Sequence, residues 1–200
     1  NFFFEKPKKL EAWFGYLWRY GFAQSKSEEI KRPGQLICFI ECSNVTVSDI
    51  TIKNSTCWSC FFHGCNEVKY INVKVRNKIY HANTDGVDVD CCKNALIENC
   101  DIKTGDDGLA IRCDSQRLKN PKPCSNITIK NCKVTSAVSG VRIGVGKGEI
   151  TGVKIDGLKI KKCGIPILIQ TRYGNKEKFA DISNIDITNL TCEDDGMTDP

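Results

Sequence analysis

Residues 45–52 read VTVSDITI, and this pattern returns along the chain at intervals of 23 to 32 residues. In each copy apolar residues fill every second position and then slip by one place beside an Asp, Asn or Gly. Alternation with a period of two predicts a β-strand, and the slip predicts a bend onto a new face. The copies begin at Val45, Val68, Ala95, Ile127, Val153 and Ile185, and the slips fall at Asp49, Asn72, Asn99, Asn131, Asp156–Gly157 and Asn189.

A second alternating run lies inside the later intervals, at residues 87–89, 109–111, 141–143 and 167–169. Each interval therefore holds about three short strands, and units of this kind must stack to cover their apolar faces. We predict an all-β fold, a parallel β-helix over residues 37–200. Residues 1–36 do not repeat and contain an aromatic cluster, which predicts an irregular cap. We also expect the helix to be truncated, since the final residues show no closing pattern.

Thirteen cysteines, an odd number, leave one thiol over if the others pair. Cys100 and Cys132 occupy one position of the repeat, which Leu158 and Leu190 occupy in the next two copies. This equivalence predicts an inward stack of buried side chains rather than a disulfide. The spacing of Cys57 and Cys60 resembles half a zinc motif without a second half, so we predict no metal and no cofactor.

The net charge of +5 is mild, and the lysines are scattered along alternating runs as on a solvated sheet face. A nucleic-acid partner would require a concentrated basic patch, so we predict none. No run of about 18 apolar residues occurs, and we therefore predict no membrane span. We expect a monomer.

Carboxylates crowd between residues 83 and 112, in NTDGVDVD (83–90) and GDDGLAIR (105–112). Asp85 and Asp106 are 21 residues apart, close to one coil, so stacking should bring their backbones within about 5 Å. Asp107 follows directly. Carboxyl groups this close cannot all ionise, and a protonated acid beside an ionised base is what glycoside hydrolysis needs. A Ca²⁺ site and solvated turn acids remain alternatives.

The segments Asn83–Gly86 and Gly105–Asp107 resemble two signature motifs of glycoside hydrolase family 28, the polygalacturonases and related pectin hydrolases. Residues 54–58, NSTCW, resemble a further strand of that family, and the resemblance runs from about residue 32 to 192. It implies a right-handed parallel β-helix, an extracellular enzyme, a pectin-like polysaccharide substrate and inversion at the anomeric carbon. By position it makes Asp106 the general acid, while Asp85 and Asp107 hold and activate the water.

Two family motifs are altered in this chain. Ser139 stands where the family has the His of Gly-His-Gly, and residues 168–170, LIQ, stand where it has Arg-Ile-Lys. Arg112, Arg142, Lys147 and Arg172 could supply substitute positive charges. His81 precedes Asn83 by two residues, which on a strand would place both on one face. We therefore predict Asn83, His81, Arg112 and Arg142 as substrate-binding residues.

The altered motifs keep two other functions open. One is a binding β-helix without catalysis, in which the acids hold Ca²⁺ or contact sugar. The other is a lyase or epimerase on the same scaffold, which would need Arg112 or Arg142 as a base beside Ca²⁺.

Overall fold

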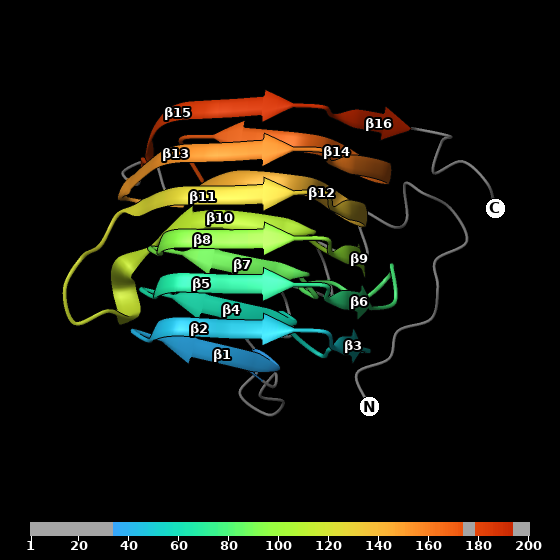
Figure 1. Cartoon of the computed structure of the whole chain (residues 1–200), viewed down its shortest axis with the longest axis horizontal. Helices are drawn as coiled ribbons and strands as arrows, with labels where there is room; N and C mark the ends of the chain where they lie inside the picture. Colours follow the sequence, from blue (N-terminus) through green and yellow to red (C-terminus); the bar gives the residue numbers. More distant parts are fainter. Residues whose placement is uncertain (1–33, 174–178, 194–200) are drawn as a thin grey trace.

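The computed structural model describes residues 34–173 and 179–193, and this part of the chain is almost entirely β-structure (Figure 1). Its strands wind into stacked coils, and each strand pairs in parallel with its equivalent in the next coil. The prediction of an all-β, right-handed parallel β-helix is confirmed.

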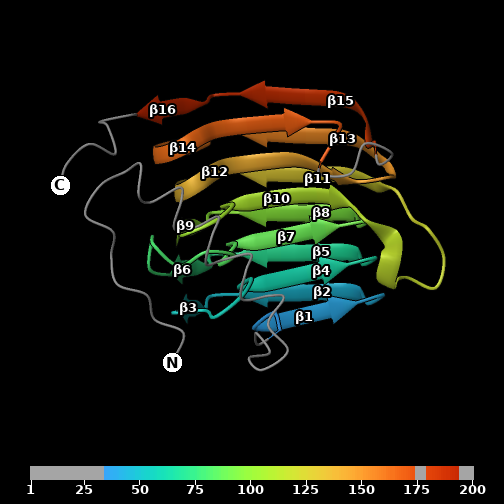
Figure 2. The same ribbon diagram turned by 180° about the vertical axis from the view of Figure 1, so that it is seen from behind.

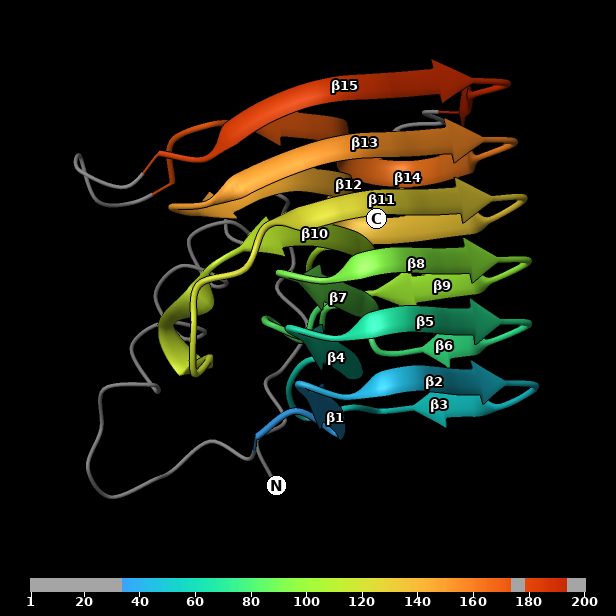
Figure 3. The same ribbon diagram turned by 60° about the vertical axis from the view of Figure 1, so that its left-hand side comes forward.

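Each coil contributes a strand to three faces of the helix (Figures 2 and 3). The first face contains β1 (Ile37–Ile40), β4 (Cys60–His63), β7 (Val87–Asp90) and β10 (Leu109–Cys113). The second contains β2 (Ser43–Ser48), β5 (Asn66–Ile71), β8 (Lys93–Glu98), β11 (Cys124–Lys130), β13 (Glu149–Asp156) and β15 (Asp181–Thr188). The third begins with β3 (Thr51–Lys53), β6 (Lys74–Arg76) and β9 (Asp101–Thr104).

Two long strands connect the third face to the first. The initial residues of β12 (Lys133–Gly146) pair with β9, and its later residues pair with β10. In the next coil β14 (Lys159–Gln170) follows β12 in the same way, and β16 (Thr191–Glu193) pairs with its start. A short 3-10 helix, η3 (Ser115–Arg117), lies between β10 and β11, in a segment that stands out from the stack (Figure 1).

The register of the second face is the register predicted from the repeat. Val45 pairs with Val68, and the pairing continues in order through every predicted start to Ile185. The predicted bends have left-handed backbone, with φ of 58° at Asp49, 56° at Asn72 and 71° at Gly157. Asn and Gly tolerate this conformation, which explains their return at the slip in each coil.

Columns of aliphatic side chains fill the inside of the coils. Ile97, Ile129 and Ile155 follow one another in register and are at most 1% exposed. Each contributes roughly 1.5–3 kcal/mol by burial. Ile187 continues the column in the last coil of the described part but is 37% exposed. The residues that alternate as apolar in the sequence therefore point into the core of the structure, as predicted.

All thirteen cysteines are free. Cys100 and Cys132 are buried in one column with Leu158, and Leu190 ends that column with 37% exposure. Their thiols donate to backbone carbonyls, from Cys100 to Tyr70 at 3.5 Å and from Cys132 to Ile97 at 3.7 Å. The predicted Cys and Leu stack is confirmed.

The cap predicted for residues 1–36 lies almost wholly outside the described residues, so the division before residue 37 stays a prediction. Between residues 34 and 173 and between 179 and 193, no helix has the length and apolar character needed to cross a membrane.

Shortening side chains in the isoleucine column should cost more stability at a buried position than at an exposed one. We expect Ile129→Ala to lower the free energy of unfolding by about 2–5 kcal/mol, because the cavity in the middle coils cannot collapse fully. Ile187→Ala is the matched control at the exposed end of the same column and should cost less than half as much. Urea unfolding measures both, and equal losses would contradict the packing described.

The cysteines should react as thiols without prior reduction. We expect a colorimetric thiol titration of the protein denatured in the absence of reductant to count thirteen groups per chain. The folded protein should react at few of them, because nine are buried, Cys42 and Cys57 are partly exposed, and Cys38 and Cys192 are the exposed ones. A count of eleven or fewer in the denatured protein would reveal a disulfide and contradict the structure.

Candidate active site

The two acidic motifs lie just before adjacent strands of the first face. Val87 of β7 pairs with Leu109 of β10, and the backbone N–H of Gly86 donates to the Asp107 carbonyl at 2.9 Å. This register carries Asp107 to the position beside Asp85 in the next coil. Gly86 has no room for a side chain, because a Cβ would collide with the Gly108 carbonyl. The glycines after the acids therefore permit the coils to approach.

One carboxylate oxygen from each of Asp85, Asp106 and Asp107 lies within 4.8 Å of the others. The predicted meeting of the three acids is therefore present, although Asp107 rather than Asp106 is the residue in register with Asp85. Asp106 turns back toward the preceding coil, where its Oδ2 accepts the Asn83 backbone N–H at 2.7 Å and the Asn83 side-chain amide at 3.2 Å. Asn83 thus holds Asp106 in place.

The buried side-chain amide of Asn77 supports the turns that carry the acids. The Asn77 side chain donates to the Ser59 hydroxyl at 2.8 Å, the Thr84 carbonyl at 3.1 Å and the Thr104 hydroxyl at 3.2 Å. Thr84 Oγ1 donates to the His81 carbonyl at 2.7 Å and accepts the Gly105 N–H at 3.1 Å. Asn77 and Thr84 therefore tie together the two turns that carry the acids.

Two carboxyl groups of the cluster are shifted toward their protonated form. Burial first, and the neighbouring Asp107 carboxylate second, raise the pKa of Asp106 to about 6, although hydrogen bonds from Asn83 oppose the change. Burial also raises the pKa of Asp85 well above its ordinary value, and the charges of Asp88, Asp106 and Asp107 add to this. The cluster therefore holds protons in a range where isolated carboxylates have lost them.

Asp107 has a different environment because a cation contacts it. The Arg142 Nε donates to Asp107 Oδ2, and the Arg142 side chain is 12% exposed. The guanidinium carbon lies 5.3 Å from the centre of the Tyr173 ring. Within the described residues, Oδ1 of Asp107 and Oδ1 of Asp85 are buried without a hydrogen-bond partner. These two oxygens therefore have unused hydrogen-bonding capacity.

Arg112 is in β10, which follows Asp107 in the same coil, and it contacts other acids. Its Nη1 is 3.5 Å from Asp88 Oδ1, its Nε is 3.7 Å from Asp90 Oδ2, and its Cζ is 4.5 Å from the Trp58 ring centre. The acidic residues between positions 83 and 112 are therefore not all in one cluster. Asp88 and Asp90 pair with Arg112, while Asp101 pairs with Arg76 on the third face.

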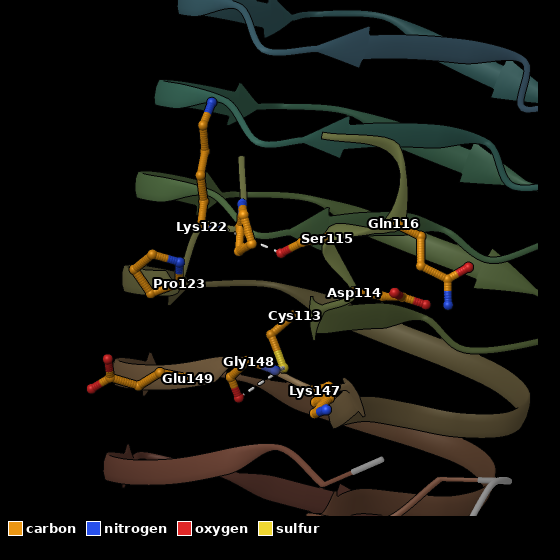
Figure 4. A pocket seen from close by; sticks show the side chains of 10 residues that line it. Cys113, Asp114, Ser115, Gln116, Lys122, Pro123, Lys147, Gly148 and Glu149 are labelled. Atoms are coloured by element: carbon orange, nitrogen blue, oxygen red, sulfur yellow. Dashed lines mark hydrogen bonds between the residues drawn. The ribbon is translucent and has the colours of Figure 1, made fainter. Parts of the chain in front are cut away.

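The remaining candidates lie in different places. His81 is buried in a turn against Gly105, so the expectation that it shares a strand face with Asn83 is wrong, because residues 77–86 form no strand. Lys147 lines a pocket of about 560 Å³ beyond the carboxyl ends of β10 and β12, opposite to the acids (Figure 4). Arg172 lies 6.0 Å from the Phe179 ring.

The two altered motifs are visible in the register of β12 and β14. Ser139 follows Asp107 in the next coil, and its carbonyl accepts the Gly108 N–H at 2.8 Å. Its buried hydroxyl has no hydrogen-bond partner in the described part of the chain. Leu168 pairs in register with Arg142. A cation is therefore present on this face, one coil earlier than the Arg-Ile-Lys segment of the family.

Sequence reasoning missed three supporting residues: Asn77, Thr104 and Ser136. The Ser136 hydroxyl donates to the Asp106 carbonyl and accepts the Val138 N–H at 3.0 Å, so it fixes the backbone of the acid. Thr104 directly precedes the second acidic motif, and this adjacency is a signal that could have indicated it. Asn77 and Ser136 stand apart from either motif in sequence.

Comparison with known proteins gives one consistent result. The sequence profile described as "Glycosyl hydrolases family 28" matches residues 14–122 and 115–196. A polygalacturonase of Juniperus ashei is 33% identical over 155 residues, which are 75% of this chain and 29% of that protein. An endo-polygalacturonase of Pectobacterium parmentieri is 25% identical, with 88% of this chain and 50% of that protein covered. The chain spans half or less of the length of these relatives.

A solved structure resembles the fold as well. The polygalacturonase from Erwinia carotovora ssp. carotovora superimposes with a TM-score of 0.64 at 21% sequence identity. The match covers 88% of this chain and 61% of the other. This likeness supports the β-helix fold.

The raised pKa of Asp106 should make stability depend on pH. A carboxyl group with a folded pKa of about 6 binds its proton more tightly in the folded than in the unfolded chain. Its contribution is therefore fully present below the unfolded pKa of about 4 and is lost as pH rises through about 6. The parent should therefore lose on the order of 1–3 kcal/mol of its free energy of unfolding between pH of about 4 and about 6. We expect the Asp106→Asn variant, measured by urea unfolding, not to show this loss.

The control for this measurement is Asp186→Asn, which removes an exposed carboxyl group from the outer surface of β15. A variant Asp106→Asn with the same pH dependence as the parent would contradict the protonation described.

Proposed function

Because the chain belongs to glycosyl hydrolases family 28, we propose that it hydrolyses glycosidic bonds of a pectin-type polysaccharide. In this proposal Asp106 is the general acid, and Asp85 and Asp107 hold and activate the attacking water. This chain provides the stacked coils that carry the three acids.

The observation that carries the proposal is the grouping of three carboxyl groups, of which Asp106 has a raised pKa and Asp107 is paired with Arg142. Asp106, whose pKa is raised to about 6, keeps a proton in mildly acidic solution. Such a group can protonate the oxygen of the leaving sugar, since a general acid works best when its pKa is close to the working pH. The Oδ1 atoms of Asp85 and Asp107 have no hydrogen-bond partner among the described residues, so each can accept a hydrogen bond from the attacking water once small side-chain movements admit it.

The supporting residues have positioning roles in this proposal. Asn83 donates two hydrogen bonds to Asp106 and so fixes the direction of the acid. Arg142 is bonded to Asp107 and balances its negative charge, so that the base and the acid can coexist at close range. Ser136 holds the Asp106 backbone from the next coil.

The substrate-binding assignments concern the same face of the helix. Arg112 stacks on Trp58 and Arg142 lies near Tyr173, which provides cations and aromatic rings side by side. Cations suit an acidic sugar polymer, and aromatic faces suit sugar rings. We therefore assign Arg112 and Arg142 to substrate carboxylates, with Asn83 and His81 at the edge of the cleavage position.

The stereochemical course is a separate part of the proposal. The acids lie within 4.8 Å, which is closer to the separation of about 5–5.5 Å in retaining enzymes than to about 6.5–9.5 Å in inverting ones. Inversion therefore rests on the family resemblance. Proton magnetic resonance of the first product anomer decides between the two courses.

A second candidate function is supported by the same oxygens. Asp85, Asp106 and Asp107 together offer oxygen ligands, which Ca²⁺ prefers, and the family His and Arg-Ile-Lys residues are replaced. In this case the chain would bind sugar or Ca²⁺ without cleaving. A lyase or epimerase would place its base at Arg112 or Arg142, and an unsaturated product absorbing in the ultraviolet would reveal a lyase. Extracellular location and a monomeric state also remain parts of the proposal.

Removing the general acid should nearly abolish hydrolysis. We expect Asp106→Asn to lower kcat/KM on polygalacturonate or a related pectic oligosaccharide by about 10²–10⁴-fold, since the leaving oxygen then lacks its proton donor. The rate of the parent protein should fall as pH rises through about 6, where Asp106 loses its proton. Reducing-end release measures both.

The exposed-surface variant Asp186→Asn serves as the control and should retain the parent rate. No release of reducing ends by the parent on any pectic glycan, together with calorimetric Ca²⁺ binding that Asp85→Asn removes, would favour the binding function instead.

A further inference from the structure

A second polar cluster lies at the other end of β7 from the three acids. His63 is the last residue of β4, Asp90 is the last residue of β7, and these two residues pair in register. Cys91 follows Asp90 directly. The His63 Nδ1 atom is 3.5 Å from Asp90 Oδ2, and the Cys91 Sγ atom is 3.3 Å from Asp90 Oδ1. One donor atom from each of the three residues lies within 4.8 Å of the others.

The histidine of this cluster is buried without satisfying its nitrogens. His63 is 1% exposed, and neither ring nitrogen has a hydrogen-bond partner in the described part of the chain. Burial of such polar atoms is costly unless a partner is supplied. The Phe61 ring stacks on the imidazole, with 5.1 Å between the ring centres, and so fixes its plane. The structure therefore holds a rigid imidazole beside a carboxylate and a thiol.

We infer that His63, Asp90 and Cys91 bind a zinc ion, or a divalent ion with the same coordination chemistry. Imidazole nitrogen, carboxylate oxygen and cysteine sulfur are the ligands that zinc uses in proteins. Ligand atoms of a tetrahedral zinc site lie roughly 3.3–3.6 Å apart, given metal–ligand distances of about 2.0–2.3 Å. The separation of 3.5 Å between His63 and Asp90 already falls in this range. Small side-chain rotations complete the site.

The fourth position points toward the segment between β10 and β11. The Ser115 hydroxyl lies 3.3 Å from the Cys91 sulfur, and Ser115 also lines the pocket of Figure 4. Ser115 or a water held by it would complete a tetrahedron. The Asp114 backbone N–H donates to Asp90 Oδ1 at 2.8 Å and orients the carboxylate. Such outer contacts strengthen a metal site.

Arg112 is the positive group nearest to the proposed ion. Its Nε lies 3.7 Å from Asp90 Oδ2, and its Nη1 lies 3.5 Å from Asp88 Oδ1. Asp88 is fully buried and remains as a partner when Asp90 binds the ion. Asp90 can therefore serve the metal without leaving the guanidinium unpaired.

The ion would have a structural role, because it would connect two coils and fasten the segment that covers them. Leu118 of this segment packs against Gly64, and Lys122 donates to the Gly64 carbonyl at 2.9 Å. Lys122 also pairs with Glu41 at 3.1 Å. The metal would add an attachment through Ser115 to these contacts. This site departs from the expectation of no metal and is independent of the acidic cluster.

Cobalt substitution tests the inference directly. The metal-free chain, kept reduced, is titrated with Co²⁺. We expect one equivalent to produce the visible bands of a tetrahedral ion and the near-ultraviolet band of a thiolate ligand, with displacement by Zn²⁺. Cys91→Ser should lose the thiolate band, and His63→Gln should weaken binding by at least about 100-fold. Cys113→Ser, which alters a buried cysteine outside the cluster, should keep the full spectrum.

A stability measurement provides a second criterion that needs no variant. Equimolar Zn²⁺ should raise the Tm of the metal-free parent by at least about 4 °C, because the folded chain holds the three ligands together and binds the ion more tightly than the unfolded chain does. Absence of a thiolate band, the same band in Cys91→Ser, or an unchanged Tm would overturn the inference. In each of these cases the approach of His63 to Asp90 at 3.5 Å is a direct contact without a metal.

Discussion

In-register stacking of parallel strands is the constraint on which the rest of this structure depends. A backbone ladder that joins Gly86 to Asp107 also fixes which side chains meet across coils. It places Val87 over Leu109 inside the helix and, in the preceding turns, Asp85 beside Asp107 outside it. The burial of many inward columns stabilises the register, and this stabilisation offsets the electrostatic cost of crowding carboxyl groups. The site is therefore a consequence of the same pairing that forms the core.

The first face carries polar groups at both ends of β7, and they are organised differently. Before the strand, three acids lie close together; the pKa of Asp85 and of Asp106 is raised, and Asp107 is paired with Arg142. After the strand, His63 and Cys91 flank Asp90 beneath a covering segment, a state suited to holding an ion. Arg112 lies between them and pairs with Asp88 and Asp90. The second group still acts on the first, because the charge of Asp88 helps to raise the pKa of Asp85, while the charge of Arg112 opposes this change.

The repeat could be predicted from sequence because its signal is local and periodic. Apolar alternation gave the register from Val45 to Ile185, and Asn72 or Gly157 marked bends through their tolerance of left-handed backbone. The meeting of the acids followed from the coil length alone. The partner of Asp107 could not be predicted in this way, because Arg142 lies 35 residues away and coil lengths vary. The role of Asn77 could not be predicted either, since its partners Ser59, Thr84 and Thr104 come from three separate segments of the sequence.

The central claim is that stacking and burial keep a proton on Asp106 at a pH where an isolated carboxyl group has lost it. Carbon magnetic resonance of the chain labelled at the aspartate carboxyl carbon follows each group through a pH titration. The account predicts one resonance with a midpoint of about 6, absent in Asp106→Asn. Titration of every aspartate near the ordinary value of about 4 would contradict it.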